Sequence, residues 1–229
     1  MKLVGLLGGM SWESSAEYYR LANELVRERA GGLASARLLL HSVDFAEVER
    51  LQAEDRWDEA GALLAEAATG LEAGGAQLLV LCTNTMHKVA PAIEAAVSIP
   101  LLHIGDVTAA AVRAAGLRRV GLLATAYTME QSFLRERLAG HGLTVLVPEA
   151  ADRAVVHRVI YDELCQGIVS EDSRRAYREV IGRLVAAGAE GIILGCTEIE
   201  LLVDQTDSAV PVFPTTRLHV EAAITAALE

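Results

Sequence analysis

Residues 77 to 85 read QLLVLCTNT, an apolar run that ends on Cys82 and is followed at once by small polar residues. A short apolar run bounded in this way predicts a buried β-strand that meets a turn. Similar runs alternate along the chain with longer, alanine-rich stretches whose apolar residues recur at helical spacing. Strands that are apolar on both faces and separated by helices are typical of a parallel sheet covered by helices. The sequence therefore predicts an α/β fold.

The same patterns place the individual elements along the chain. Strands are predicted at residues 3–7, 37–43, 77–82, 100–104, 119–124, 143–147, 191–196 and 210–213. Long helices are predicted at residues 14–30, 54–73, 106–115, 129–140 and 172–187. Helices between successive strands provide the crossover connections that parallel strands need.

The two halves of the chain resemble each other at three landmarks that keep the same order. Parallel strands of any α/β protein look alike, so a single landmark carries little weight. Three landmarks in the same order favour two similar four-stranded units, joined near residues 98–118. The landmarks are VGLL at 4–7 and again at 120–123, the strands ending in Cys82-Thr83 and Cys196-Thr197, and IPLLHIGD from 99 echoed by VPVFPTTR from 210.

Composition narrows the class of protein. The 229 residues are 52% hydrophobic and 22% charged, which is typical of globular chains long enough for one large or two small domains. A net charge of −11 repels phosphate backbones and anionic lipid, so neither nucleic acid nor a membrane is expected as a partner. The sequence shows no membrane span and no secretory cleavage site. Three widely spaced cysteines do not form a disulfide framework, so we expect the cytoplasm as the location.

Cys82 and Cys196 end equivalent strands, and each precedes a threonine and a further polar residue. Ligands bind at the carboxyl edge of parallel α/β sheets, where both cysteines are expected. Either cysteine alone is also explained as a small apolar residue that packs at a strand end. The pair favours a shared role. If the units face each other about a pseudo-twofold axis, the two thiols approach one cleft from opposite sides.

Two acid/base groups on opposite faces of one carbon are what inversion of a stereocentre requires. One thiolate removes the proton and leaves a planar carbanion, which the opposing thiol protonates on its other face. Near-attack distances of about 3 to 3.5 Å from each sulfur to the carbon put the sulfurs about 7 Å apart, too far for a disulfide. The ordinary pKa of a thiol is about 8.5, and we expect the N-terminus of the following helix to lower it toward 7.

The lysines and histidines argue against a cofactor or a metal. Racemisation with pyridoxal phosphate needs a Schiff-base lysine. Only Lys2 and Lys88 are present; Lys2 lies at the terminus, and Lys88 lacks a phosphate loop and is also explained as a solvated helix residue. The six histidines show no metal-ligand spacing such as H-E-x-x-H. We therefore expect no cofactor and no metal.

Five segments stand in order along the chain: GLLGGMSWES, LHSVDF, LCTNTMHK, TAYTME and GCTEIELL. Together they resemble the aspartate/glutamate racemase family, most closely its broad-specificity amino-acid racemase branch, over essentially the whole chain. The resemblance implies a pyridoxal-independent amino-acid racemase of two Rossmann-like units, assembled as a homodimer. It implies that Cys82 and Cys196 are the paired acid/base residues. With the C-terminal helix returning to the first unit, the domains are expected at residues 1–98 plus 212–229 and residues 99–211.

Polar residues beside the cysteines are candidates for binding the substrate. Thr83, Asn84 and Thr85 offer hydroxyl, amide and backbone N–H groups that suit an α-carboxylate, although they would also cap the next helix. Thr197 and Glu198 follow the second thiol, and Glu198 stands where the first unit has Asn84. We hypothesise that Glu198 faces the substrate ammonium group or tunes the thiol beside it.

Met10 and Ser11 follow the first strand at the same sheet edge, and the resemblance implies substrate contacts there. Met10 is also explained by packing. The glycines of the preceding GLLGGM do not spell G-x-G-x-x-G, and the acidic residue Asp44 comes later than that motif expects. A dinucleotide-binding domain is therefore not favoured.

Substrate selectivity depends on the groups that meet the side chain. In aspartate-specific relatives the resemblance implies an arginine and a lysine on the second carboxylate. Here Gln52 and Cys165 stand at those positions, although Arg50 lies nearby. Without two cations a dicarboxylate loses charge-assisted hydrogen bonds of about 1.5 to 3 kcal/mol each, so neutral or polar amino acids are expected, with aspartate and glutamate left open. Cys165 is also explained as a packing thiol.

Three other classes compete with a racemase. A cysteine hydrolase needs a histidine base, and His87 is the nearest to Cys82 in sequence, but it leaves the second thiol unexplained. Maleate isomerases and arylmalonate decarboxylases share the superfamily's architecture and use one cysteine. A non-catalytic amino-acid-binding protein would show ligand affinity without proton exchange.

Overall fold

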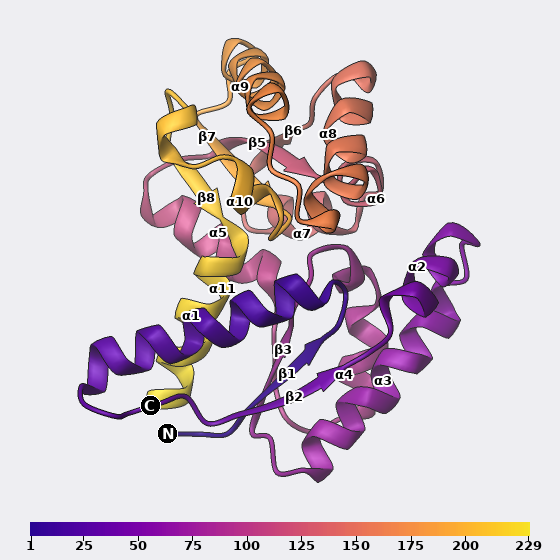
Figure 1. The fold of residues 1–229 in the computed structure, drawn as a ribbon, viewed down its shortest axis with the longest axis vertical. Helices are drawn as coiled ribbons and strands as arrows, with labels where there is room; N and C mark the ends of the chain where they lie inside the picture. Colours follow the sequence, from indigo (N-terminus) through magenta and orange to yellow (C-terminus); the bar gives the residue numbers. More distant parts are fainter. The chain divides into compact units, whose positions relative to one another are not determined.

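The computed structural model describes residues 1–229, and the chain divides into two compact units. The first unit comprises Met1–Ile104 with His219–Glu229, and the second comprises Gly105–Leu218. Each unit contains one four-stranded sheet in which all strand pairs are parallel (Figure 1). The predicted α/β class with two four-stranded units is confirmed.

The first sheet has the strand order β2-β1-β3-β4. Its strands β1 and β3 are buried along their whole length, as central strands of a covered parallel sheet are. Leu7 of β1 pairs with Leu81 of β3, so the residues that follow these two strands leave the sheet at the same edge. The strands are β1 (Val4–Gly8), β2 (Leu38–Ser42), β3 (Leu78–Leu81) and β4 (Leu101–Leu102).

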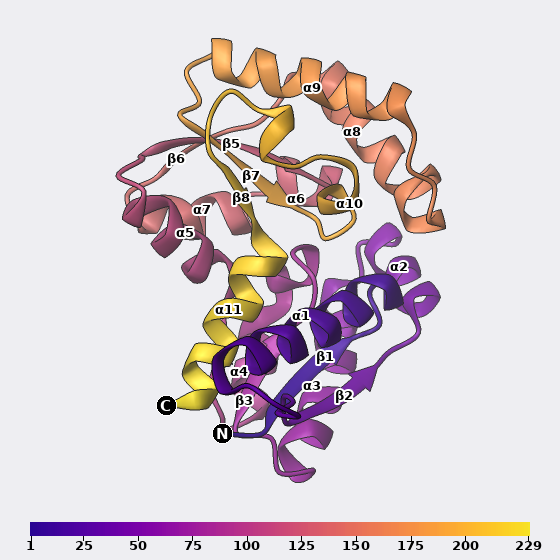
Figure 2. The same cartoon turned by 60° about the vertical axis from the view of Figure 1, so that its left-hand side comes forward.

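Helices cover both faces of the first sheet (Figure 2). Leu6 and Val80 face α1 (Trp12–Ala30) and the part of α11 (Thr215–Leu228) that belongs to this unit. On the other face Gly5 lies so close to α3 (Trp57–Ala73) that a Cβ there would be 3.3 Å from Leu71 Cβ. The unit also contains α2 (Phe45–Ala53), the 3₁₀ helix η1 (Thr85–Val89) and α4 (Ala90–Ala96).

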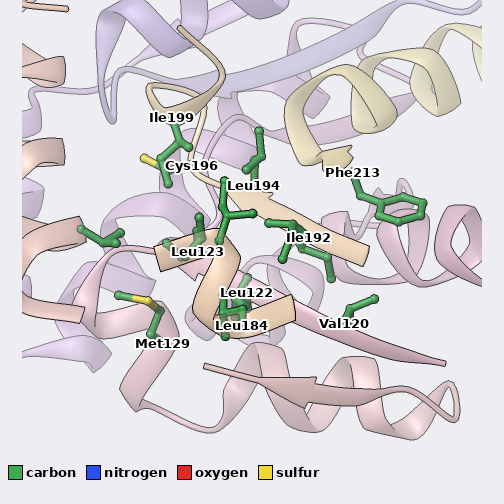
Figure 3. Close-up of a cluster of buried hydrophobic side chains, with 14 of the residues drawn as sticks. Val120, Leu122, Leu123, Met129, Leu184, Ile192, Leu194, Cys196, Ile199 and Phe213 are labelled. Carbon is green, nitrogen blue, oxygen red and sulfur yellow. The ribbon is translucent and has the colours of Figure 1, made fainter. Parts of the chain in front are cut away.

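The second sheet repeats the strand order of the first, as β6-β5-β7-β8. Its core is the larger of the two clusters described, and Figure 3 shows the side chains of β5 and β7 meeting those of the surrounding helices. The strands are β5 (Arg119–Ala124), β6 (Thr144–Leu146), β7 (Gly191–Gly195) and β8 (Val212–Pro214). The helices are α5 (Ile104–Ala114), α6 (Ala126–Glu130), α7 (Phe133–Gly140), α8 (Ala150–Asp162), η2 (Leu164–Gln166), α9 (Glu171–Ala186), α10 (Ile199–Leu202) and η3 (Gln205–Asp207).

All eight predicted strands are present, but two of the predicted helices differ: one begins later than expected and one is divided. The helix expected at 54–73 begins at Trp57, and a separate α2 precedes it. Asp55 has a φ of 56°, a left-handed conformation that interrupts an α-helix. The helix expected at 129–140 is divided into α6 and α7 because Gln131 is extended.

The expected boundaries of the units need correction. Strand β4 pairs with β3, so residues 99–104 stay with the first unit instead of opening the second. Strand β8 pairs with β7, so residues 212–218 stay with the second unit. The chain changes unit at 104/105 and 218/219 because hydrogen-bonded strands cannot be separated from their sheet. No helix combines the length and the apolar character needed to cross a bilayer.

Candidate active site

Cys82 is the first residue after β3, and both of its backbone polar groups are bound. Its N–H donates to Leu7 O at 2.9 Å, and its carbonyl accepts from Ser14 Oγ at 3.1 Å. The thiol is fully buried, with Sγ 3.7 Å from Val80 O. Burial raises the pKa of the Cys82 thiol well above its ordinary value. In this environment Cys82 holds its proton, which suits an acid.

Cys196 occupies the equivalent place after β7, but a carboxylate lies directly on its thiol. Cys196 Sγ donates to Glu198 Oε2 at 2.8 Å, and both residues are buried. Burial, and after it the charge of Glu198, raises the pKa of Cys196 well above its ordinary value. Figure 3 shows the thiol beside Ile199 at the end of the core cluster. The Glu198 carboxylate accepts the hydrogen bond of the thiol, and its charge opposes ionisation of that thiol.

The expected lowering of both thiol pKa values by a following helix is wrong. Cys82 is followed by a bend and the five-residue 3₁₀ helix η1, and Cys196 by a turn and the four-residue α10. Burial that no positive charge compensates disfavours the thiolate form. Desolvation therefore dominates at both cysteines.

The candidate substrate-binding residues of the first unit gather around the Cys82 turn. Met10 and Ser11 follow β1, and Ser11 caps α1 by accepting from Ser14 N at 3.3 Å. Gln52 reaches the same region from α2, since its Nε2 donates to Met86 Sδ at 2.8 Å. The Gln52 side chain is buried and its Oε1 accepts no hydrogen bond. The remaining candidates, Thr83, Asn84 and Thr85, follow Cys82 in the turn. Asn84 and Thr85 are buried and Thr83 is half-buried.

A glycine pair makes the turn after β1 possible. Gly9 has a φ of 95°, and a Cβ there would overlap the backbone of Val43. Its N–H donates to Ser15 Oγ at 2.7 Å, and a Cβ on Gly8 would meet the same hydroxyl. The chain therefore folds closely onto the start of α1.

In the second unit Thr197 and Glu198 lie beside Cys196, as expected, and a further residue joins them. Thr197 Oγ1 lies 2.9 Å from Thr216 Oγ1, and Thr216 is fully buried. Thr215 Oγ1 donates to Leu194 O at 2.8 Å, which ties the start of α11 to β7. Sequence reasoning noted the PTTR segment as a landmark only, and its threonines carried no separate signal.

The sequence profile of the Asp/Glu/Hydantoin racemase family matches residues 7–223, almost the whole chain. The chain belongs to the Asp/Glu/Hydantoin racemase family. Solved structures agree with this assignment. A proposed Asp/Glu racemase from Yersinia pestis is 55% identical with a TM-score of 0.94, and the match covers 100% of both chains. An aspartate racemase homologue from Pyrococcus horikoshii OT3 is 33% identical with a TM-score of 0.88, again over 100% of both chains.

A curated relative gives a second line of similarity. The chain is 25% identical to the broad specificity amino-acid racemase RacX of Bacillus subtilis (strain 168) over 158 residues. That match covers 68% of this chain and 66% of the relative, so it spans just under two thirds of the curated protein. Family membership and these relatives support a racemase-type isomerase.

Two side chains that competing hypotheses used have other roles in this family member. His87 Nδ1 lies 2.7 Å from Thr83 O, and its Nε2 accepts from Ile104 N at 3.2 Å. With both ring nitrogens bound to backbone groups, His87 is not placed as the base of a cysteine hydrolase. Lys88 Nζ lies 3.6 Å from the centroid of the Trp57 ring, a cation–π contact that accounts for its position.

Proposed function

We propose that this chain is a cofactor-independent amino-acid racemase in which the thiols of Cys82 and Cys196 act on opposite faces of the substrate α-carbon. The observation that carries the proposal is the matched pair of buried thiols. Each follows the third strand of a sheet, and the two sheets have the same strand order. Membership of a racemase family supports the reaction class.

The different surroundings of the thiols suggest how a reaction cycle starts. Cys196 passes its proton to Glu198 Oε2, 2.8 Å away, and becomes a thiolate. The thiolate removes the α-proton, and the electron pair of the C–H bond remains on carbon as a planar carbanion. Cys82 gives its thiol proton to the opposite face and becomes a thiolate in turn. Exchange with solvent then returns a proton to Cys82 and removes one from Glu198, which restores the starting state. From the other enantiomer Cys82 begins as the thiolate and Cys196 as the acid, so no cofactor is consumed.

The polar groups of each turn are proposed to hold the rest of the substrate. Hydroxyl, amide and backbone N–H groups at Thr83, Asn84 and Thr85 suit the α-carboxylate, with Thr197 acting from the second unit. Met10 and Ser11 would line the same region.

Glu198 is proposed to act on the thiol and not on the substrate carboxylate. Once Cys196 has protonated it, Glu198 no longer carries the negative charge that opposes formation of the Cys196 thiolate.

Gln52 is proposed to select the substrate side chain. Its buried Oε1 accepts no hydrogen bond, and a buried acceptor without a donor costs about 1 to 3 kcal/mol. A neutral side chain with an N–H or O–H group would satisfy it, whereas a second carboxylate would not. We therefore expect broad specificity centred on polar, uncharged amino acids.

The substitution Gln52→Met tests this selection while keeping the volume of the side chain. Loss of one neutral hydrogen bond predicts a KM about three- to tenfold higher for donor-bearing substrates such as serine and glutamine. Alanine, which has no side-chain donor, is the control substrate and should keep its KM. Equal changes for alanine and glutamine would show that Gln52 does not contact the side chain.

Two wider expectations accompany the proposal. The family resemblance implies a homodimer, which light scattering on the purified protein would test. The proposal also places the protein in the reducing cytoplasm, where free cysteines stay reduced; the three cysteines are free in the structure.

The decisive experiment incubates the protein with single enantiomers of the common amino acids in deuterium oxide, with reductant and without pyridoxal phosphate. Optical rotation and α-deuterium content are followed together. A racemase incorporates solvent deuterium in the inverted product. Binding without exchange would identify an amino-acid-binding protein. In a parallel incubation with an arylmalonate, loss of carbon dioxide would identify a decarboxylase. Either result would refute the proposal.

A further inference from the structure

His87 is a buried imidazole whose proton position is fixed by its neighbours. The backbone N–H of Ile104 can only donate, so His87 Nε2, 3.2 Å away, must be the acceptor. The ring proton therefore lies on Nδ1, which donates to Thr83 O at 2.7 Å. The ring is 3% exposed. His87 is thus held as one neutral tautomer between two backbone groups.

The Nδ1 hydrogen bond closes the turn that carries the first thiol. Thr83 directly follows Cys82, and its own N–H donates back to Leu81 O at 2.9 Å. The backbone N–H of His87 donates to Asn84 O at 3.1 Å. Asn84 makes no side-chain cap at the start of η1, so the imidazole provides a side-chain bond that fixes this turn. The chain from Leu81 to His87 is folded back on itself and closed by the ring.

Little else directs the thiol of Cys82. Its hydrogen bond to Val80 O, at 3.7 Å, is weak, in contrast to the 2.8 Å contact between the Cys196 thiol and Glu198. The position of the sulfur therefore depends on the backbone at residues 82 and 83. A displacement of about 1 Å costs a proton-transfer step about 10²-fold.

We propose that His87 is a positioning residue, whose Nδ1–H holds the carbonyl of Thr83 and so orients the Cys82 thiol and the adjacent turn for proton transfer. The inference rests on the racemase function proposed above. His87 itself neither gives nor takes a proton in the reaction. Its second nitrogen anchors the ring to Ile104, the last residue of the first unit before the chain enters the second.

Two isosteric variants separate the two hydrogen bonds. In His87→Asn the side-chain amide nitrogen lies near the position of Nδ1 and can still donate to Thr83 O. In His87→Gln the amide reaches the position of Nε2 and can accept from Ile104 N, but the donor to Thr83 is lost. We expect His87→Asn to keep kcat within about threefold of the native enzyme and His87→Gln to lose about 10²-fold, with KM changed less than kcat. Equal kcat values for the two variants, or the reverse order, would overturn the inference.

A matched control comes from the same histidine cluster. His219 is fully buried, and its ring centroid lies 5.8 Å from that of His87, but its nitrogens bind Tyr18 OH and Leu102 O instead of the Cys82 turn. His219→Gln should destabilise the fold while leaving kcat of the folded protein within about threefold of native. Urea unfolding of all three variants separates stability from turnover.

A measurement on the native protein remains decisive even if a variant fails to fold. In protein labelled with ¹⁵N-histidine, the chemical shifts and couplings of His87 report which nitrogen carries the proton. We expect a protonated Nδ1 and a bare Nε2 at pH 8. A proton on Nε2 would overturn the inference whether or not the protein racemises amino acids. Absence of racemisation together with the expected tautomer would instead count against the proposed function.

Discussion

The two cysteine turns occupy equivalent places in two sheets of the same strand order, yet they hold their thiols in different ways. Around Cys82 the backbone is fixed by hydrogen bonds from Ser14 Oγ and to Leu7 O, and the thiol meets only a distant carbonyl. Around Cys196 the thiol itself is bound, by Glu198 Oε2 at 2.8 Å. The first turn gives its thiol only a distant carbonyl as hydrogen-bond acceptor, and the second gives its thiol a carboxylate.

The difference shows that equivalent positions in a repeated fold need not carry equivalent chemistry. A two-base racemase must work from either enantiomer, so each thiol has to serve as acid in one direction and base in the other. Burial raises the pKa of both thiols, but only Cys196 has an internal proton acceptor. We therefore expect both thiols to be protonated at rest, with Glu198 as the proposed acceptor through which Cys196 becomes the base.

The largest effect should come from removing either thiol. Cys82→Ser and Cys196→Ser replace the acid/base group by a hydroxyl that is far harder to ionise, and each should lower racemisation by about 10² to 10⁴-fold. If the turns differ as described, the variants should also differ from each other. In each variant the remaining thiol should still exchange the α-proton with deuterium oxide, but from one enantiomer only. The two variants should keep exchange with opposite enantiomers.

The third cysteine provides the control for those substitutions. Cys165 is half-buried and packs against the core of the second unit. Cys165→Ser should leave racemisation within about threefold of native, because a packing residue takes no part in proton transfer. A Cys82→Ser or Cys196→Ser variant that racemises as fast as Cys165→Ser would break the comparison and the mechanism together.

A second effect should distinguish the two units by the dependence of their stability on pH. Burial lowers the pKa of His219 to about 4, from an ordinary value of 6.5, and the Leu102 carbonyl opposes the shift. A histidine with a lowered pKa in the folded state stabilises the fold above pH 6.5 and loses that contribution as the pH falls toward 4, because the unfolded chain takes up the proton first. Between pH 7.5 and pH 5 the loss amounts to about 2 kcal/mol.

Urea unfolding of the native protein and of His219→Gln at the two pH values measures this loss. The difference in unfolding free energy between the two proteins should shrink by about 2 kcal/mol at pH 5, since the variant has no imidazole to titrate. His219 packs in the first unit, so hydrogen exchange should report the weakening in the first sheet and not in the second. A constant difference across the pH range would show that His219 titrates normally.

The sequence was sufficient to predict the architecture because apolar runs and turn residues are local signals. It placed all eight strands, and it picked out both cysteines from their positions at the strand ends. It missed α2 and began α3 too early, because the left-handed φ of Asp55, which separates the two helices, has no apolar pattern to reveal it. It placed the unit boundaries wrongly because strand pairing, which decides them, joins residues far apart in the chain.

The surroundings of the site were harder to predict for a related reason. The role of His87 depends on the backbone groups of Thr83 and Ile104, and a backbone carbonyl leaves no mark in a sequence. The contact between Thr197 and Thr216 also joins separate segments. The contact between Cys196 and Glu198 spans two residues, and comparing the two repeats was enough to suggest it.

The smallest effect, and the one that sharpens the comparison most, should come from Glu198→Gln. The variant removes a negative charge that raises the pKa of Cys196, so the thiol should ionise at lower pH and react faster with iodoacetamide at pH 8, relative to Cys82 in the same molecule. Racemisation should nevertheless fall by about tenfold, because the acceptor that takes the thiol proton is gone. The alkylation rate should therefore rise while the racemisation rate falls.

Glu190→Gln is the control. It removes a carboxylate that binds the backbone of Arg118 and Arg119, and it should change neither the alkylation rate nor the racemisation rate. If Glu198→Gln instead raised both alkylation and turnover, Glu198 would act only as a repelling charge, and the two turns would carry the same chemistry after all.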